Sequence, residues 1–233
     1  MSSKLNEGRV AIVTGAGQGL GRAHAHAFAA DGAAVVVNDY DADSANTVAQ
    51  EIRDAGGQAV ASVGDVADWA YGESLIATAV DEFGRLDTLV NNAGFVEVVP
   101  AESERPDTFE AVLDVNLGGT FRCAQRFGRE MLAQRSGSIV NVASIFGVVG
   151  VGQIPQASYV ASKGGLVNLT RELAAQWARR GVRVNAVAPA FFPSEMTAEM
   201  FDDERSRRWM RQRTPMGRPG RLDELVGPVM FLA

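Results

Sequence analysis

Three polar residues in the second half of the chain could together move a proton. Tyr159 and Lys163 are four residues apart in Y-V-A-S-K, so on a helix they share one face, one turn apart. An ammonium beside a phenol favours the phenolate and lowers the tyrosine pKa from its ordinary value of about 10, which suits proton transfer. Ser144 follows an apolar run and could hold a hydroxyl or carbonyl oxygen by a hydrogen bond. The set predicts acid/base chemistry at an alcohol or ketone, with an ordinary amphipathic helical turn as the alternative.

A glycine-rich stretch near the N-terminus predicts a phosphate site. Val10 to Gly21 reads V-A-I-V-T-G-A-G-Q-G-L-G and leads into an alanine-rich run of helical length. A strand that turns sharply into a helix leaves unpaired N–H groups at the helix N-terminus, and these favour a pyrophosphate. Gly15, Gly19 and Gly21 would allow the tight turn, the close approach of phosphate and the packing of helix on strand. A plain glycine-rich connection is the alternative.

Asp39 follows the next apolar strand, about 20 residues on, where a carboxylate can accept hydrogen bonds from a ribose 2′-hydroxyl. A carboxylate there would repel a 2′-phosphate, and no Lys or Arg lies between Arg22 and Arg53 to offset it. Asp39 therefore favours a nucleotide whose ribose carries a free 2′-hydroxyl rather than a 2′-phosphate, with a solvated carboxylate at a strand end as the alternative.

The elements that must position these residues alternate along the whole chain, which is typical of an α/β fold with a doubly wound parallel sheet covered by helices on both faces. No linker divides residues 1–233, so we expect one domain for cofactor binding and catalysis. Strands are expected over 10–13, 33–39, 58–63, 86–90, 138–143 and 182–187. Helices are expected after the turn that ends at Gly21 and from near residues 41, 68, 106 and 157, and the helix over 106–135 should kink or make a close approach at Gly118 and Gly119. The carboxyl ends of the strands bring together Thr14, Asp39, Asp65, Asn91, Ser144 and Pro189.

The composition excludes several classes of function. A net charge of -6 argues against nucleic acid or an anionic membrane as the main partner, and the basic cluster over 205–213 is interpreted as a solvated helix. One cysteine, Cys123, and no apolar leader favour a reducing, cytoplasmic location. No spacing of metal ligands is present, and His24 and His26, two residues apart, are expected on a helix surface.

The sequence resembles the short-chain dehydrogenase/reductase family over nearly its whole length. The matching motifs are T-G-A-G-Q-G-L-G at 14–21, G-D-V at 64–66, N-N-A-G at 91–94, Asn116, Ser144, Y-x-x-x-K at 159–163 and R-V-N-A-V-A-P at 183–189. The resemblance implies that Tyr159 is the general acid/base, that Ser144 stabilises the substrate oxygen and that Lys163 binds the nicotinamide ribose. It also implies that Asn116 holds a water in a proton relay. It assigns the cofactor site to Gly15, Gln18, Gly19, Leu20, Gly21, Asp39, Asp65, Val66, Asn92, Ala93, Gly94, Tyr159, Lys163, Pro189, Phe192 and Ser194.

Two departures from the family pattern stand out. Where the family usually has P-G-x-I-x-T, this chain has P-A-F-F-P-S; Ser194 keeps a hydroxyl, and Ala190 replaces a glycine. The sequence ends at Ala233, where the family normally continues into a seventh strand, so six strands are expected.

The main hypothesis is an NAD-dependent oxidoreductase that interconverts a secondary alcohol and a ketone, acting on a partly apolar small molecule. The alternative is an NADP-dependent 3-oxoacyl thioester reductase or a hydroxyacyl thioester dehydrogenase. A non-catalytic NAD-sensing scaffold is a further alternative, which the presence of both Tyr159 and Lys163 disfavours. The resemblance also implies a homo-oligomer, a tetramer or dimer, built through the long helices over 107–135 and 157–180.

Overall fold

A computed structural model describes residues 4–233 of the chain, and a six-stranded parallel sheet forms its centre. The strands are β1 (Val10–Val13), β2 (Ala34–Asp39), β3 (Gln58–Val63), β4 (Thr88–Asn91), β5 (Gly137–Val142) and β6 (Val182–Val187). They lie in the order β3-β2-β1-β4-β5-β6, and every neighbouring pair is parallel. The order reverses between β1 and β4, which is where open α/β sheets bind ligands. The predicted fold class is confirmed.

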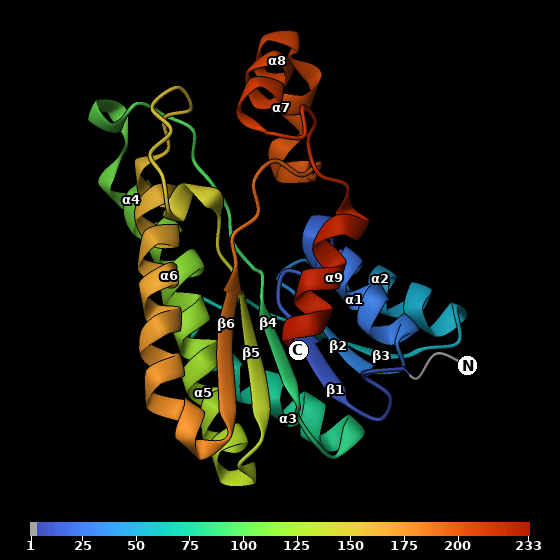
Figure 1. The fold of residues 1–233 in the computed structure, drawn as a ribbon. Coiled ribbons are helices and arrows are strands. Elements are labelled where there is room, and N and C mark those ends of the chain that lie inside the picture. Colours follow the sequence, from blue (N-terminus) through green and yellow to red (C-terminus); the bar gives the residue numbers. More distant parts are fainter. Residues whose placement is uncertain (1–3) are drawn as a thin grey trace.

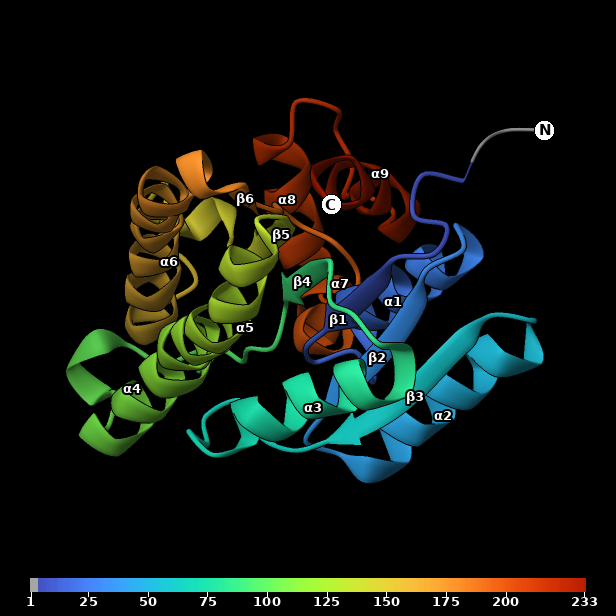
Figure 2. The ribbon, with the colours of Figure 1, turned by 90° about the horizontal axis from the view of Figure 1, so that it is seen from below.

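Helices cover both faces of the sheet (Figures 1 and 2). One face packs against α1 (Gly19–Ala30), α2 (Ala42–Asp54) and α9 (Leu222–Leu232), and the other against α3 (Tyr71–Phe83), α5 (Thr120–Gln134) and α6 (Ala157–Trp177). Side chains alternate along each strand. Ala11 and Val13 therefore join the core under α1 and α2, whereas Val10 and Ile12 join the core under α3, α5 and α6.

The helical stretch expected over 106–135 is interrupted where the glycine pair predicted a kink. It consists of α4 (Pro106–Leu113), a π-helical segment (Asp114–Gly119) and α5. A Cβ on Gly119 would lie 2.8 Å from Cγ2 of Val66, so the expected close approach is present as well. The π-helical segment carries Asn116.

The chain after β6 is helical. A short 3-10 turn (Glu195–Thr197), α7 (Ala198–Asp202) and α8 (Glu204–Arg213) lie beyond the carboxyl edge of the sheet, and α9 returns alongside α1 (Figure 1). All five arginines of α8 are exposed, as expected for a solvated helix. Within residues 4–233 the sheet has no seventh strand.

The expectation that both histidines lie on a helix surface was wrong for His24. Its side chain is 1% exposed, and neither ring nitrogen has a hydrogen-bond partner. Burial lowers the His24 pKa to about 4, because an interior site disfavours the charged imidazolium. His26 is partly exposed and its Nε2 lies 3.0 Å from Glu51 Oε2.

Candidate active site

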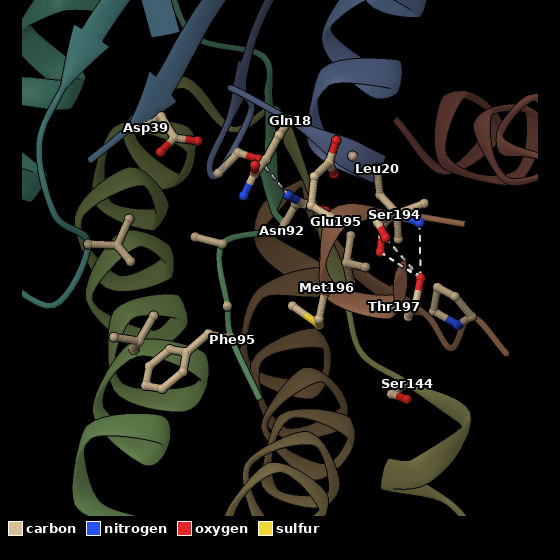
Figure 3. Close-up of a pocket in the computed structure, with 18 of the residues that line it drawn as sticks. Gln18, Leu20, Asp39, Asn92, Phe95, Ser144, Ser194, Glu195, Met196 and Thr197 are labelled. Atoms are coloured by element: carbon tan, nitrogen blue, oxygen red, sulfur yellow. Dashed lines mark hydrogen bonds between the residues drawn. The ribbon is translucent and has the colours of Figure 1, made fainter. Parts of the chain in front are cut away.

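A pocket of about 390 Å³ opens at the carboxyl end of the sheet, and it spans the point where the strand order reverses. Most of the predicted site residues line it, from both halves of the sheet: Gly15, Gln18, Gly19, Leu20, Asp39, Asp65, Val66, Asn92, Ala93, Gly94, Ser144, Tyr159, Lys163, Pro189, Phe192 and Ser194. Gly21 and Asn116 lie outside this lining. Figure 3 shows several of these side chains around the cavity.

The glycine loop forms a cradle at the start of α1. Gly15 and Gly19 have φ values of +59° and +53°, which glycine adopts without strain. A Cβ on Gly21 would lie 2.1 Å from the carbonyl oxygen of Gly15, so α1 packs against the loop only because Gly21 has no side chain. No side chain caps the N-terminus of α1. Its first N–H groups can therefore bind phosphate oxygens.

Asn92 and Thr14 join the loop to the end of β4. The Asn92 side chain donates to the carbonyl oxygens of Thr14 and Gly15, each at 3.0 Å. The Thr14 hydroxyl oxygen accepts from the N–H groups of Asn92 and Ala93, at 3.0 and 3.1 Å. Asn92 therefore holds the backbone of the pocket floor, and the adenine ribose contact implied for it stays a prediction.

Asp39 is fixed at the end of β2 with its side chain in the pocket. Its Oδ2 accepts from the Gly17 N–H at 2.9 Å, and its Oδ1 accepts from the Asp41 N–H at 3.1 Å. Lys163 is the only Lys or Arg among the described residues that line the pocket, against the carboxylates of Asp39, Asp65 and Glu195. The lining thus carries no arginine or lysine at the Asp39 end to balance a 2′-phosphate.

Tyr159 and Ser144 meet across the pocket from α6 and the end of β5. Burial raises the Tyr159 pKa, and a hydrogen bond with Ser144 opposes that rise. The expected lowering of the tyrosine pKa by Lys163 is therefore wrong for this structure, because desolvation of the phenolate outweighs the other effects. The Ser144 hydroxyl also accepts from the Phe146 N–H at 3.2 Å, which sets its direction.

Lys163 lies under the tyrosine ring. Its ammonium nitrogen is 5.6 Å from the Tyr159 ring centroid and donates to the carbonyl oxygen of Val142 at 2.8 Å. The residue is 5% exposed, and burial lowers the Lys163 pKa to about 8. The spacing of four residues correctly placed lysine and tyrosine on one helix face, but it could not reveal that the ammonium is bonded to β5.

Asn116 lies behind the pocket wall. Its amide exchanges two hydrogen bonds with the backbone of Phe95, both 2.9 Å long, and donates to the Ser162 hydroxyl at 3.1 Å. Its water-holding role stays a prediction.

The segment after β6 closes one side of the pocket. Ser194 and Thr197 form a capping box, in which the Ser194 N–H donates to Thr197 Oγ1 at 2.9 Å and the two hydroxyls are 3.0 Å apart. The Ser194 hydroxyl thus faces Thr197, and its contact with a cofactor carboxamide stays a prediction.

Several residues that line the pocket were not predicted from the sequence. Tyr40 and Phe95 follow strand-end motifs that could have identified them, whereas Glu195 and Met196 come from a turn without such a signal.

These residues can act on a hydroxyl or carbonyl group. The Ser144 and Tyr159 hydroxyls can both bond one substrate oxygen, and Tyr159 can give it or take from it a proton. The glycine cradle, the uncapped α1 N-terminus and Asp39 fit a nicotinamide dinucleotide, which would supply or accept the hydride.

Comparison with known proteins identifies the family. The family model described as "short chain dehydrogenase" matches residues 9–205, so the chain belongs to this family. A 3-oxoacyl-[acyl-carrier-protein] reductase of Synechocystis sp. is 39% identical over 97% of this chain and 89% of the relative. A (2S)-[(R)-hydroxy(phenyl)methyl]succinyl-CoA dehydrogenase subunit of Thauera aromatica is 35% identical over 97% and 90%. The crystal structure of a gluconate 5-dehydrogenase from Burkholderia cenocepacia in complex with NADP and tartrate has a TM-score of 0.92 and 39% identity, over 97% of this chain and 88% of that one.

The chain is an oxidoreductase that acts on hydroxyl or ketone groups with a nicotinamide cofactor. Within residues 4–233, no helix has the length and apolar character needed to span a membrane. The same residues contain no group of three or more His, Cys, Asp or Glu side chains that could hold a metal ion.

Proposed function

We propose that the chain interconverts 3-oxoacyl and 3-hydroxyacyl thioesters in one domain, with Tyr159 as general acid/base. This thioester reaction is the alternative hypothesis drawn from the sequence. The relatives favour it over the main hypothesis of an oxidoreductase for an unspecified secondary alcohol. The names of the Synechocystis and Thauera relatives both specify thioesters of an acyl carrier or coenzyme A. The observation that carries the reaction is the convergence of Ser144, Tyr159 and Lys163 in one pocket with the glycine cradle.

The proposed roles of this chain's residues follow from their contacts. Ser144 and Tyr159 would bond the 3-oxo oxygen, and Tyr159 would donate its proton as the carbonyl becomes an alcohol. The raised Tyr159 pKa keeps the phenol protonated, as donation requires. The Lys163 ammonium, held by Val142, would stabilise the phenolate that remains after the proton has left. Phe95, Val115 and Met196 would contact the apolar part of the acyl chain.

The cofactor has two candidates. We propose NAD(H), because Asp39 presents its carboxylate where a 2′-phosphate would bind and no lining cation lies beside it. NADP(H) is the second candidate, favoured by the NADP bound to the Burkholderia gluconate 5-dehydrogenase.

The test combines binding and turnover. Dissociation constants for NADH and NADPH, measured by quenching of tryptophan fluorescence, are expected to differ by at least about tenfold in favour of NADH, about 1.4 kcal/mol. Replacing Asp39 with Ala should narrow or reverse that difference. Acetoacetyl-CoA should be reduced, with loss of absorbance at the nicotinamide band. Turnover of gluconate with NADP and none of the thioester would contradict the proposed substrate, and tighter binding of NADPH would contradict the proposed cofactor.

We also propose that copies of the chain associate through α4, α5 and α6. A groove between these helices is lined by the half-buried side chains of Leu113, Leu117, Phe121 and Leu169. We expect analytical ultracentrifugation to show a dimer or tetramer for the wild type and a monomer for Phe121→Glu. A wild-type monomer would contradict the proposal.

A cytoplasmic location stays a prediction.

A further inference from the structure

A carboxylate from the segment after β6 reaches the phosphate cradle. Glu195 begins the turn that follows Ser194, and its side chain lies beside Gln18 and Leu20 (Figure 3). Its Oε2 would be only 2.9 Å from a Cβ on Gly19, the first residue of α1. The Glu195 carboxylate thus occupies the space over the uncapped N-terminus of that helix.

This carboxylate has no charge partner. Among residues 4–233, the side chain of Glu195 takes part in no hydrogen bond or ion pair, whereas Glu51, Glu204 and Glu224 each pair with arginine. The only cationic side chain of the pocket lining, Lys163, is bonded to Val142. A helix N-terminus stabilises an adjacent anion, so the position suits Glu195 as it would suit a pyrophosphate.

Two anions cannot share this place without repulsion, because like unit charges a few ångströms apart repel each other even near the protein surface. We propose that Glu195 is an internal competitor of the cofactor pyrophosphate, displaced from Gly19 when the dinucleotide binds. Displacement of Glu195 would move or reorient the turn over 195–197, which carries the lining residues Met196 and Thr197. Glu195 therefore sets cofactor affinity and couples cofactor binding to the shape of the substrate side of the pocket. The inference rests on the proposed dinucleotide binding at α1.

The test is charge removal at Glu195 with a matched control. Glu195→Gln keeps the size and removes the charge, and we expect it to tighten NADH binding about tenfold at low ionic strength, about 1.4 kcal/mol. The gain should shrink in 0.5 M salt, because ions screen the repulsion. Glu199→Gln makes the same charge change in α7, four residues along the segment and outside the pocket lining, and should leave the NADH dissociation constant within about twofold of wild type.

Different results separate this inference from the proposed function. Wild type that binds neither NADH nor NADPH would contradict dinucleotide binding, and the inference with it. Wild type that binds NADH with the same affinity as Glu195→Gln would overturn the inference alone. An equal gain in Glu199→Gln would also overturn it, because the effect would then come from net charge rather than from the contact with Gly19. Since Glu195 is exposed, both variants should fold, which circular dichroism checks.

Discussion

The side-chain amide of Asn116 pairs with the backbone of Phe95 in both directions, accepting from its N–H and donating to its carbonyl oxygen at 2.9 Å. Asn116 also donates to Ser162, whose hydroxyl donates to the carbonyl oxygen of Tyr159 at 2.8 Å. One fully buried amide therefore connects the loop after β4, the π-helical segment and α6, which carries Tyr159. Asn116 is a positioning residue in this structure.

Replacing Asn116 with Ala should destabilise the protein by about 2 to 4 kcal/mol, because it leaves the part-buried N–H and carbonyl of Phe95 without this partner and removes one of the two hydrogen bonds of the Ser162 hydroxyl. Urea unfolding followed by circular dichroism measures this. The control is Asn46→Ala, which removes an exposed amide bonded within α2 to Ala42, with an expected cost below about 0.5 kcal/mol. Equal effects of the two substitutions would contradict the positioning role.

Replacing Tyr159 with Phe removes the hydroxyl proposed to transfer the proton and keeps the ring over Lys163. The kcat should fall by at least about 100-fold, while the dissociation constant for NADH stays within about twofold. Tyr71→Phe is the control: Tyr71 lies outside the pocket lining, and the substitution removes a part-buried hydroxyl that bonds Ser62 and the side chain of the lining residue Asn38. Tyr71→Phe should lower stability and leave the kcat of the folded protein unchanged. Turnover of Tyr159→Phe near the wild-type rate would exclude the acid/base role.

Replacing glycine with alanine should have opposite effects on stability at Gly21 of α1 and at Gly164 of α6, because their surroundings differ. Gly21→Ala places a Cβ 2.1 Å from the Gly15 carbonyl oxygen, so backbone must shift, and we expect a loss of more than about 2 kcal/mol together with weaker NADH binding. Gly164→Ala, in the interior of α6, meets only the Gly147 carbonyl oxygen at 3.6 Å. That variant should gain about 0.5 to 1 kcal/mol, because alanine favours the helix. Thermal unfolding of both variants checks the prediction, and a stable Gly21→Ala would contradict the close packing.

The sequence predicted those features that depend on local pattern. Apolar runs indicated the strands, and the glycine pair indicated the close approach at Gly119. The set of residues at the strand ends was also predictable, because strands of a parallel sheet all end at one edge. It did not predict features that depend on long-range packing. The direction of the Tyr159 pKa shift follows from how much of the pocket closes over the phenol, and the approach of Glu195 to Gly19 joins residues from opposite ends of the chain. The spacing of residues along the sequence predicts neither the pKa shift nor this contact.

The burial of His24 belongs with these and predicts a pH dependence of stability. The folded-state pKa is about 4 against 6.5 for the free side chain, so the unfolded chain takes up the proton first as the pH falls. The contribution of His24 to stability is therefore complete above pH 6.5 and is lost progressively between pH 6.5 and 4. A pKa shift of this size corresponds to about 3 kcal/mol of folding stability.

His24→Leu should reduce the loss of stability between pH 7 and pH 4.5, measured by urea unfolding at each pH. His26→Gln, which alters the partly exposed histidine beside Glu51, should keep the wild-type loss over that range. If wild type and His24→Leu lost stability in parallel, the acid sensitivity would come from other groups and not from this buried imidazole.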